Sequence, residues 1–209
     1  MADAETSRIK LYFAPRTRSV RVLWLLEELG LPYELARVEF VPTTTRFFIQ
    51  QTPTGKLPTI EDGDVVMSES GAIVEYLLER YDDGRLAPPI GTPARGTFLQ
   101  WLHFAESTAF PPLGMVAWLT HYRDNGDRYA ALLADAVGRA KACLNQVEHA
   151  LDSRSYLAGD DFTAADVMMG FTLWAARLLK VLDGGYPNIA AYLQRLEARP
   201  ACQAAFAAG

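Results

Sequence analysis

Residues Thr54–Tyr81 contain two short β-prone runs, a turn signal and an amphipathic helix in immediate succession. Asp62-Gly63 separates the runs Thr59–Glu61 and Val65–Ser68, and this dipeptide favours a tight hairpin because glycine adopts positive φ at little cost. From Ser70 onward the apolar residues recur at helical spacing. The stretch therefore predicts a two-stranded hairpin that leads directly into a helix.

Two features beside this hairpin suit the binding of a short peptide with a free carboxylate. Leu57-Pro58 is an X-Pro bond, the kind that adopts the cis form at tight turns, and a cis bond would leave the Leu57 backbone to pair with an extended peptide. Ser70 opens the helix, where unpaired first-turn N–H groups bind anions, and Glu69 stands beside it. The alternative interpretation is a hairpin and a helix with a capping serine and no ligand.

The composition narrows the class of protein. The chain has 209 residues, half of them hydrophobic, which is enough for one large or two small domains, and no apolar run is as long as a membrane span. Its first residues lack the basic and apolar regions of a secretion signal, so we expect a cytoplasmic protein with no membrane partner. The net charge is −5 and Lys and Arg are dispersed, so no nucleic-acid partner is expected.

The two cysteines form no CxxC pair and the three histidines show no metal-ligand spacing, so we expect neither a dithiol nor a metal site.

The residues before the hairpin predict a strand, a helix and a second strand. Ile9–Phe13 and Tyr33–Val38 have the β-prone composition, and Val20–Leu29 between them has a broad apolar helical face. Ala14–Ser19 is a polar loop, and Thr43–Gln51 is a weak helical segment. The order βαβ, short helix, ββα predicts an α/β domain of the thioredoxin-like type, with a parallel pair joined by a right-handed crossover.

A cluster of proline and glycine between Asp82 and Pro93 predicts a break between domains. We place an α/β domain at residues 1–86, a linker at 87–92 and an all-α helical-bundle domain at 93–209. No convincing strand pattern follows the linker. Helical periodicity covers four segments, which are Ala94–Tyr122, Arg128–Leu151, Thr163–Leu182 and Asn188–Arg199.

Two local signals lie within these helical segments. Pro111 and Pro112 are expected to break or kink the first of them, because proline lacks an N–H and clashes with the preceding turn. Thr163 and Asp166 have the spacing of a capping box, in which each side chain accepts a backbone N–H of the other residue. Such a cap stabilises a helix by about 1 kcal/mol. It serves folding and not chemistry.

Gly55-Lys56-Leu57-Pro58-Thr59, followed by Ser68-Glu69-Ser70-Gly71-Ala72-Ile73, resembles the glutathione-binding half of the cytosolic glutathione transferases. The capping box and Pro200 resemble that family's second domain, so the resemblance covers nearly the whole chain. It implies that Leu57, before a cis Pro58, pairs with the cysteinyl backbone of glutathione, and that Glu69 and Ser70 hold the γ-glutamyl end. It also implies that Lys56 contacts the glycine carboxylate, although a solvated lysine is the alternative. Arg16 is a second candidate for that carboxylate.

A transferase of this family ionises a thiol whose pKa is ordinarily about 8.5, which requires a hydrogen-bond donor or a positive charge beside the sulfur. We place the sulfur at the loop before the first helix, where the helix dipole also favours a negative charge. Here the sequence departs from the family's serine and cysteine patterns. Thr17 is the first candidate as a hydroxyl donor, with a structural loop role as the alternative. Arg18 is the second, as donor and counter-charge, and Ser19 is the third, with capping of the helix as its alternative role.

The family's geometry implies a pocket for a hydrophobic electrophile beside the glutathione site. We name Tyr12, His103 and Trp118 as candidates for this pocket. For Tyr12, packing in or beside the predicted strand is the favoured alternative. His103 and Trp118 lie in a predicted helix, where core packing is the alternative because aromatic residues at helical spacing usually belong to a core.

The resemblance implies a glutathione transferase, acting in detoxification, that stabilises the glutathione thiolate and transfers it to a hydrophobic electrophile. Glutathione is then a co-substrate, and no cofactor is expected. The family also implies a homodimer. Two alternatives remain open: a glutathione-dependent peroxidase or disulfide reductase, and a non-catalytic glutathione-binding, ligand-binding or scaffold protein of the same fold.

Overall fold

The computed structural model describes residues 9–39 and 51–208, which form two compact units. The first unit runs up to Tyr81 and also takes in the helix that begins at Pro200, and the second runs from Asp82 to Arg199. The helix at Pro200 thus groups with the first unit, whereas the sequence analysis assigns residues 93–209 to one helical domain. Apart from Gln51, the helical segment expected at Thr43–Gln51 lies outside the described residues.

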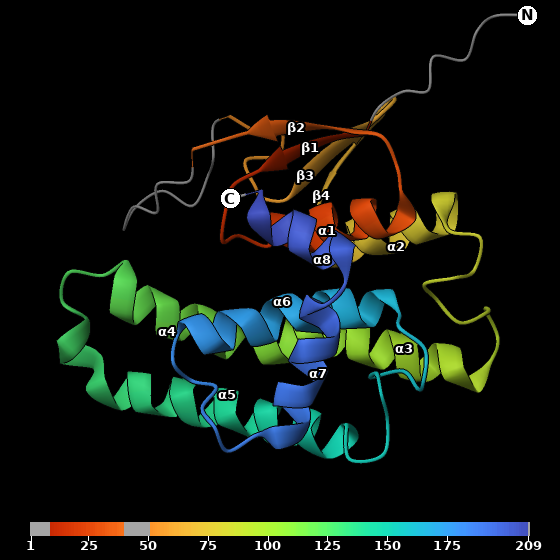
Figure 1. The fold of residues 1–209 in the computed structure, drawn as a ribbon. Coiled ribbons are helices and arrows are strands. Elements are labelled where there is room, and N and C mark those ends of the chain that lie inside the picture. Colours follow the sequence, from red (N-terminus) through yellow and green to blue (C-terminus); the bar gives the residue numbers. More distant parts are fainter. Residues whose placement is uncertain (1–8, 40–50, 209) are drawn as a thin grey trace, which may run out of the picture. The chain divides into compact units, whose positions relative to one another are not determined.

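The first unit is an α/β domain of the thioredoxin-like type (Figure 1). Its sheet has the strand order β2-β1-β3-β4, in which β1 is parallel to β2 and antiparallel to β3, and β4 is antiparallel to β3. The predicted order of elements is confirmed for the described residues. The elements are β1 (Ile9–Phe13), α1 (Ser19–Leu29), β2 (Tyr33–Arg37), β3 (Thr59–Asp62), β4 (Val65–Ser68), α2 (Ser70–Tyr81) and α8 (Pro200–Ala207).

Helix α1 is the most enclosed helix of this unit, because it contacts the sheet, α2 and α8. Every residue from Ser19 to Leu26 is buried. Trp24 meets Phe206 of α8 edge-on, with ring centroids 6.1 Å apart. Gly30 ends the helix in the left-handed conformation, with φ of 67°, which glycine adopts at little cost. Each fully buried large apolar side chain contributes about 1.5–3 kcal/mol, so α1 supplies much of the core.

The second unit is helical. No helix among the residues described in it, or elsewhere in 9–39 and 51–208, has both the length and the apolar character needed to span a bilayer. Helix α6 is its centre: it is buried from Ala164 to Leu173 and contacts α3, α4 and α7. The elements are α3 (Pro93–His103), a π-helical segment (Phe104–Ala109), α4 (Phe110–His121), a 3-10 turn (Gly126–Tyr129), α5 (Ala130–Ala150), α6 (Ala164–Leu178) and α7 (Pro187–Glu197).

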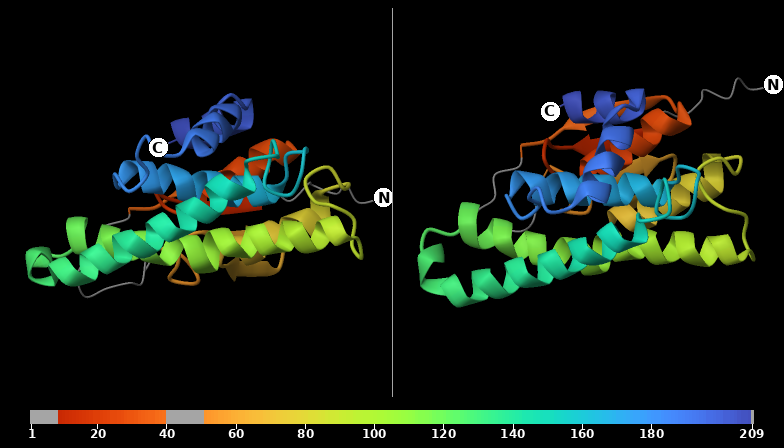
Figure 2. Two further views of the ribbon diagram at one scale, coloured as in Figure 1. Left: turned by 90° about the horizontal axis from the view of Figure 1, so that it is seen from below. Right: turned by 60° about the horizontal axis from the view of Figure 1, so that its bottom comes forward.

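Pro111 and Pro112 do not interrupt the helix that contains them. Helix α3, the π-helical segment and α4 follow one another without a gap and form one long rod, with α5 alongside (Figure 2). The π-helical segment ends at Ala109, and α4 begins at Phe110 with Pro111 and Pro112 in its first turn. Proline has no N–H to donate to the preceding turn. The wider π-helical winding before the prolines changes the hydrogen-bond pattern at that point, so the missing N–H groups are tolerated. A local change of winding therefore takes the place of the expected break.

The start of α6 has the predicted capping box. Asp166 is completely buried, and its carboxylate accepts the N–H and the hydroxyl of Thr163 at 2.8 and 3.0 Å. It also accepts the Leu157 N–H at 3.0 Å and the Tyr192 hydroxyl at 2.7 Å. Burial raises the pKa of the Asp166 carboxyl, and the four hydrogen bonds oppose that rise. The cap thus joins three separate segments of the second unit.

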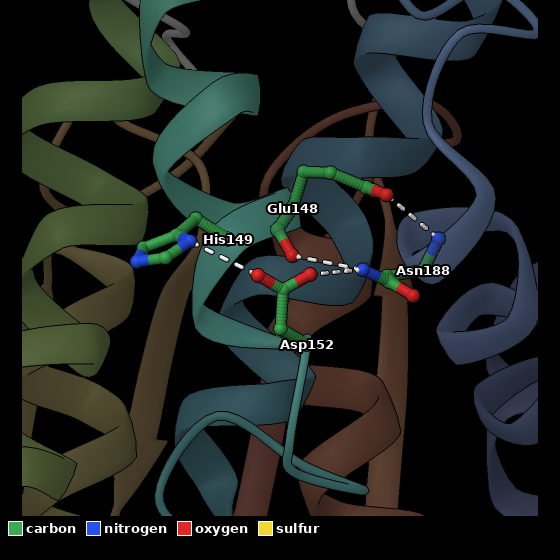
Figure 3. A network of polar contacts seen from close by, with 4 residues as sticks. All are labelled: Glu148, His149, Asp152 and Asn188. Carbon is green, nitrogen blue, oxygen red and sulfur yellow. Dashed lines mark hydrogen bonds and ion pairs between the residues drawn. The ribbon is translucent and has the colours of Figure 1, made fainter.

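The start of α7 is capped by a side chain from α5, as Figure 3 shows. The two carboxylate oxygens of Glu148 accept the N–H groups of Asn188 and Ile189, each at 2.9 Å. The Asn188 side chain donates to Asp152 at 2.7 Å, and Asp152 also pairs with His149 at 3.0 Å. A negative group at a helix N-terminus satisfies unpaired N–H groups and complements the helix dipole. This network therefore fastens α7 to α5.

Candidate functional site

Three connections of the first unit meet at one end of its sheet. Tyr12 of β1 pairs with Thr59 of β3, and Thr59 pairs with Ser68 of β4. Just beyond this row, β1 runs into the loop before α1, Leu57-Pro58 enters β3, and β4 runs into Glu69. The strand register therefore gathers at one edge the segments that the sequence nominates for catalysis and for peptide binding.

The peptide bond between Leu57 and Pro58 is cis, in agreement with the hypothesis from the sequence. Pro58 is buried and Leu57 is half-buried, while the Lys56 side chain is exposed. Within residues 9–39 and 51–208, no hydrogen bond involves the backbone N–H or carbonyl of Leu57. Both groups are therefore available, in this part of the chain, to an extended peptide added beside β3.

Glu69 and Ser70 form the junction between β4 and α2. Glu69 is exposed and has φ of 75°, a left-handed conformation that is uncommon for a residue with a side chain. Its carbonyl accepts the Ile73 N–H at 2.9 Å, which closes the first turn of α2. Ser70 is buried at the first position of the helix. An exposed carboxylate thus adjoins a helix N-terminus, a combination that suits a ligand end carrying both an ammonium and a carboxylate.

Two arginines from the start of α1 supply positive charge to this junction. Arg21 is completely buried, and its Nη1 donates to the Ser70 Oγ at 3.0 Å. Burial and the charge of Arg18 both lower the pKa of Arg21. Arg18 is half-buried; burial lowers its pKa and the negative charge of Glu69 opposes that change. The site therefore has two cations near one exposed carboxylate.

No role is expected for Arg21 from the sequence. A signal for it exists, because Arg21 is a charged residue within the otherwise apolar run Val20–Leu26. Its bond to Ser70 joins residues 49 positions apart, which periodicity alone does not reveal. A charged residue on a buried helical face is the feature that would have identified it.

The loop before α1 is organised around the backbone of Ala14. The Ser19 hydroxyl donates to the Ala14 carbonyl at 3.0 Å and accepts the Ala14 N–H at 3.2 Å. The Thr17 hydroxyl lies 2.8 Å from the same carbonyl and 2.6 Å from the Ser19 Oγ. Ser19 is completely buried, whereas Thr17 is half-buried. Of the two hydroxyls, Thr17 is the one within reach of a ligand.

The capping role considered for Ser19 is wrong. Helix α1 begins at Ser19, so Arg18 occupies the cap position, and the first N–H of the helix, that of Ser19, donates to the Thr17 Oγ1 at 3.3 Å. The Ser19 hydroxyl bonds to Ala14 because the loop turns back on itself at Arg16, whose φ is 59°. Ser19 thus fixes the loop against the end of β1.

Tyr12 takes part in contacts across the sheet. Its hydroxyl donates to Glu61 of β3, and the Lys10 ammonium lies 5.2 Å from its ring centroid. The hydrogen bond to Glu61 and partial burial raise the pKa of the Tyr12 hydroxyl. Its side chain alternates with the buried Leu11 along β1, so the two residues point to opposite faces of the sheet. The role of Tyr12 in an electrophile pocket stays a prediction.

His103 and Trp118 belong to the second unit, and they lie well apart within it. His103 is exposed at the end of α3, and Trp118 is half-buried on α4. Fifteen residues of one helical rod separate them, which corresponds to about 20 Å along its axis. One small electrophile would therefore touch only one of the two residues. Each pocket assignment stays a prediction.

The cysteines and possible metal ligands give no further site. Cys143 and Cys202 are reduced and buried, one in each unit, and burial raises the pKa of the Cys143 thiol. Among residues 9–39 and 51–208, no group of three or more His, Cys, Asp or Glu is arranged to hold a metal ion.

The chain is similar to known proteins over most of its length. The chain matches the family models "Glutathione S-transferase, N-terminal domain" over residues 7–79 and "Glutathione S-transferase, C-terminal domain" over residues 130–195. It is 32% identical to the glutathione S-transferase-like protein OpS6 of Beauveria bassiana, over 95% of this chain and 94% of that protein.

Solved structures give the same picture. A glutathione transferase from Methylococcus capsulatus has a TM-score of 0.80 and 29% identity, covering 96% of this chain and 98% of its own. A glutathione transferase homolog from Lodderomyces elongisporus, solved with two GSH per subunit, has a TM-score of 0.83 and 28% identity, with the same coverages.

Proposed function

Because this chain belongs to the glutathione S-transferase family, we propose that it is a glutathione transferase that binds glutathione along Leu57, with the γ-glutamyl end at Glu69 and Ser70. The observation that carries the proposal is the register of the sheet, which pairs Thr59 with both Tyr12 and Ser68. That register brings the cis Leu57-Pro58 segment, the start of α2 and the loop before α1 to one edge. Lys56, exposed beside Leu57, would then contact the glycine carboxylate.

The chemical step requires a thiolate. A lowering of the thiol pKa by two units, from about 8.5 to about 6.5, raises the ionised fraction at pH 7 from about 3% to about 75%. The groups available at the start of α1 are the Thr17 hydroxyl, the half-buried Arg18 and the helix dipole. Catalysis would come from stabilising this charge and holding the sulfur in place, without a covalent protein intermediate.

Thr17 is our choice as the donor to the sulfur. Thr17 and Ser19 share one acceptor, the Ala14 carbonyl. Because the Ser19 hydroxyl alone satisfies that carbonyl, the Thr17 proton can turn to a thiolate without leaving an unpaired buried group. Arg18 would add positive charge on the side facing Glu69. Ser19 keeps a structural role in this scheme.

The test measures glutathione binding by calorimetry, and turnover with a chromogenic aryl halide and with hydroperoxides. Thr17→Val and Arg18→Ala are each expected to lower kcat at least tenfold at pH 7 while glutathione still binds. The pH at which the bound thiol ionises, followed by thiolate absorbance, should rise in both variants. Unchanged turnover in both would refute the catalytic assignment, and no binding by the unmodified protein at millimolar glutathione would refute the function itself.

A second candidate function is a glutathione-binding protein without transferase activity. The observation that favours it is that both loop hydroxyls are engaged with Ala14 in the unliganded chain. Binding of glutathione with no shift in its thiol pKa, and no turnover of any electrophile or peroxide, would select this alternative. Turnover of a mixed glutathione disulfide would select a reductase instead.

Family membership also leads us to propose a cytoplasmic homodimer that detoxifies hydrophobic electrophiles. Sedimentation equilibrium across a range of protein concentrations tests the dimer. A mass of one chain, 23.1 kDa, at all concentrations would contradict it. A screen of aryl halides, epoxides and unsaturated carbonyl compounds tests the class of electrophile.

A further inference from the structure

Three threonine hydroxyls surround the backbone of Lys56, immediately before Leu57. Thr52 and Thr59 both donate to the Lys56 carbonyl, at 3.1 and 2.8 Å. The Lys56 N–H donates to the Thr54 Oγ1 at 3.3 Å, and the Thr54 and Thr59 hydroxyls lie 2.5 Å apart. We call Thr52, Thr54 and Thr59 the threonine cluster. Neither the sequence analysis nor the proposed mechanism gives these side chains a role.

The protons of this cluster can be assigned one by one, because a hydroxyl has a single proton to donate. The Thr59 proton goes to the Lys56 carbonyl, so in their mutual bond Thr54 is the donor and Thr59 the acceptor. Thr54 in turn accepts the Lys56 N–H. The result is a closed ring that starts and ends on the backbone of Lys56, and hydrogen bonds arranged in such a series strengthen one another.

The ring fixes the peptide plane that carries the Leu57 N–H. The only cis bond among the described residues is Leu57–Pro58, so the Lys56–Leu57 peptide is trans. In a trans peptide the carbonyl and the N–H lie in one rigid plane and point in opposite directions within it. Two hydroxyls hold the Lys56 carbonyl on one side, and the Leu57 N–H must therefore point to the other side, away from the threonine cluster.

The burial of the cluster shows that this arrangement is built into the fold. Thr59 is completely buried at the first position of β3, and Thr52 is 7% exposed. The Thr52 carbonyl also accepts the Gly55 N–H at 3.2 Å, in a turn where Gly55 has φ of 70°. A buried hydroxyl that lost its partner would destabilise the protein, so the orientation is held firmly.

We propose that the threonine cluster is a positioning element for glutathione: by holding the Lys56 carbonyl, it aims the Leu57 N–H at the carbonyl of the cysteinyl residue. The inference rests on the proposed glutathione site and adds to it the residues that orient its central backbone contact. An N–H fixed in advance binds its acceptor without an ordering cost at the moment of binding. The threonines touch no substrate and act through the peptide plane alone.

The experiment measures the dissociation constant of glutathione by calorimetry for the unmodified protein, Thr59→Val and Thr59→Ser. Valine keeps the shape of threonine and removes the hydroxyl, and we expect it to weaken glutathione binding about tenfold. Serine keeps the hydroxyl and should bind within about twofold of the unmodified protein. Thr172→Val is the matched control, because Thr172 is a buried threonine of the second unit, bonded to Ala105 and Met168.

Should Thr59→Val not fold, Thr54→Val opens the same ring at a half-buried position, and we expect it to weaken binding about threefold.

A glutathione analogue whose cysteinyl carbonyl is replaced by a methylene group separates aiming from general support of the fold. It lacks the acceptor for the Leu57 N–H, so Thr59→Val should alter its affinity less than about twofold. Equal losses for glutathione and the analogue, or no loss for glutathione, would overturn the inference while leaving the proposed function intact. Failure of the unmodified protein to bind glutathione at all would overturn both.

Discussion

Two helix starts in this protein, those of α2 and α6, each combine a hydroxyl residue with an acidic one. At α6 the acidic residue, Asp166, is completely buried, and its carboxylate accepts four hydrogen bonds. At α2 the acidic residue, Glu69, is exposed with φ of 75°, and the neighbouring Ser70 hydroxyl accepts a bond from the buried Arg21. The acidic residue is therefore turned inward at one helix and outward at the other, while the hydroxyl residue is buried at both.

This difference separates the structural role of Asp166 from the binding role that we propose for Glu69. A carboxylate whose acceptor positions are filled by its own protein stabilises the fold and has nothing left for a ligand. Glu69 instead has a left-handed backbone that costs about 1–3 kcal/mol for a residue other than glycine, and the rest of the fold must offset that cost. Strain of this kind concentrates at binding and catalytic sites, in agreement with the function proposed for α2.

The largest effect is expected for Asp166→Ala at the inward-facing cap. The variant leaves the Leu157 N–H and the Tyr192 hydroxyl without their acceptor, and we expect the free energy of unfolding to fall by about 3 kcal/mol. Urea denaturation followed by circular dichroism measures it. Asp161→Ala, at an exposed aspartate, is the control and should change stability by less than about 0.5 kcal/mol. A loss of less than about 1 kcal/mol for Asp166→Ala would contradict the structural role of Asp166.

Arg21→Met tests the start of α2 by removing the buried cation that contacts it. Replacing a buried charge by an apolar side chain of similar length is often neutral for folding, so we expect unfolding to change by less than about 1 kcal/mol. Glutathione affinity should fall about 30-fold, because Ser70 loses its donor and the site loses a charge. Arg154→Met, at an exposed position, should leave the affinity unchanged. A variant that binds normally but unfolds easily would make Arg21 a structural residue.

Glu69→Gln removes the exposed negative charge and keeps the shape of the side chain. We expect glutathione to bind about tenfold more weakly, since its ammonium loses a counter-charge, and the free energy of unfolding to remain within about 0.5 kcal/mol. Isothermal titration compares it with Glu79→Gln, an exposed glutamate of the same helix. Equal affinity in the two variants would argue that Glu69 does not contact the ligand.

The smallest effect is a pH dependence at the inward-facing cap. Burial raises the folded-state pKa of the Asp166 carboxyl above its ordinary value of 3.8. At a pH between the ordinary pKa of 3.8 and the raised pKa, Asp166 keeps its proton in the folded protein but has released it in the unfolded chain. The free energy of unfolding therefore falls as the pH rises through this range. The difference in unfolding free energy between the unmodified protein and Asp166→Asn, which does not titrate there, should shrink as pH rises from 4 toward 7. A difference that grows with pH would contradict the raised pKa.

The elements that depend on local sequence could be predicted well. The hairpin at Asp62-Gly63, the helix from Ser70 and the capping box at Thr163 each follow from residues a few positions apart, and the structure contains all three. The placement of α8 with the first unit could not be predicted in this way. Periodicity shows which face of a helix is apolar, but it does not show which distant segment covers that face.

The same limit applies to the candidate site. Leu57, Glu69 and Ser70 could be nominated because their neighbours form a recognisable local pattern. Arg21 reaches Ser70 across 49 residues, and a contact of this length depends on how α1 packs beside α2. The roles of Thr17 and Ser19 depend on how the two hydroxyls share the Ala14 carbonyl and on which of them is buried, a matter of loop geometry that residue type does not determine.

The contact between Trp24 of α1 and Phe206 of α8 has a consequence for the biogenesis of the protein. The ribosome synthesises the segment from Asp82 to Arg199, 118 residues, between the strands of the first unit and the helix that covers α1. At about 5–20 residues per second, translation of that segment lasts about 6–24 s. During this interval the Trp24 side of α1 has no covering helix, and the nascent chain is then most open to chaperones.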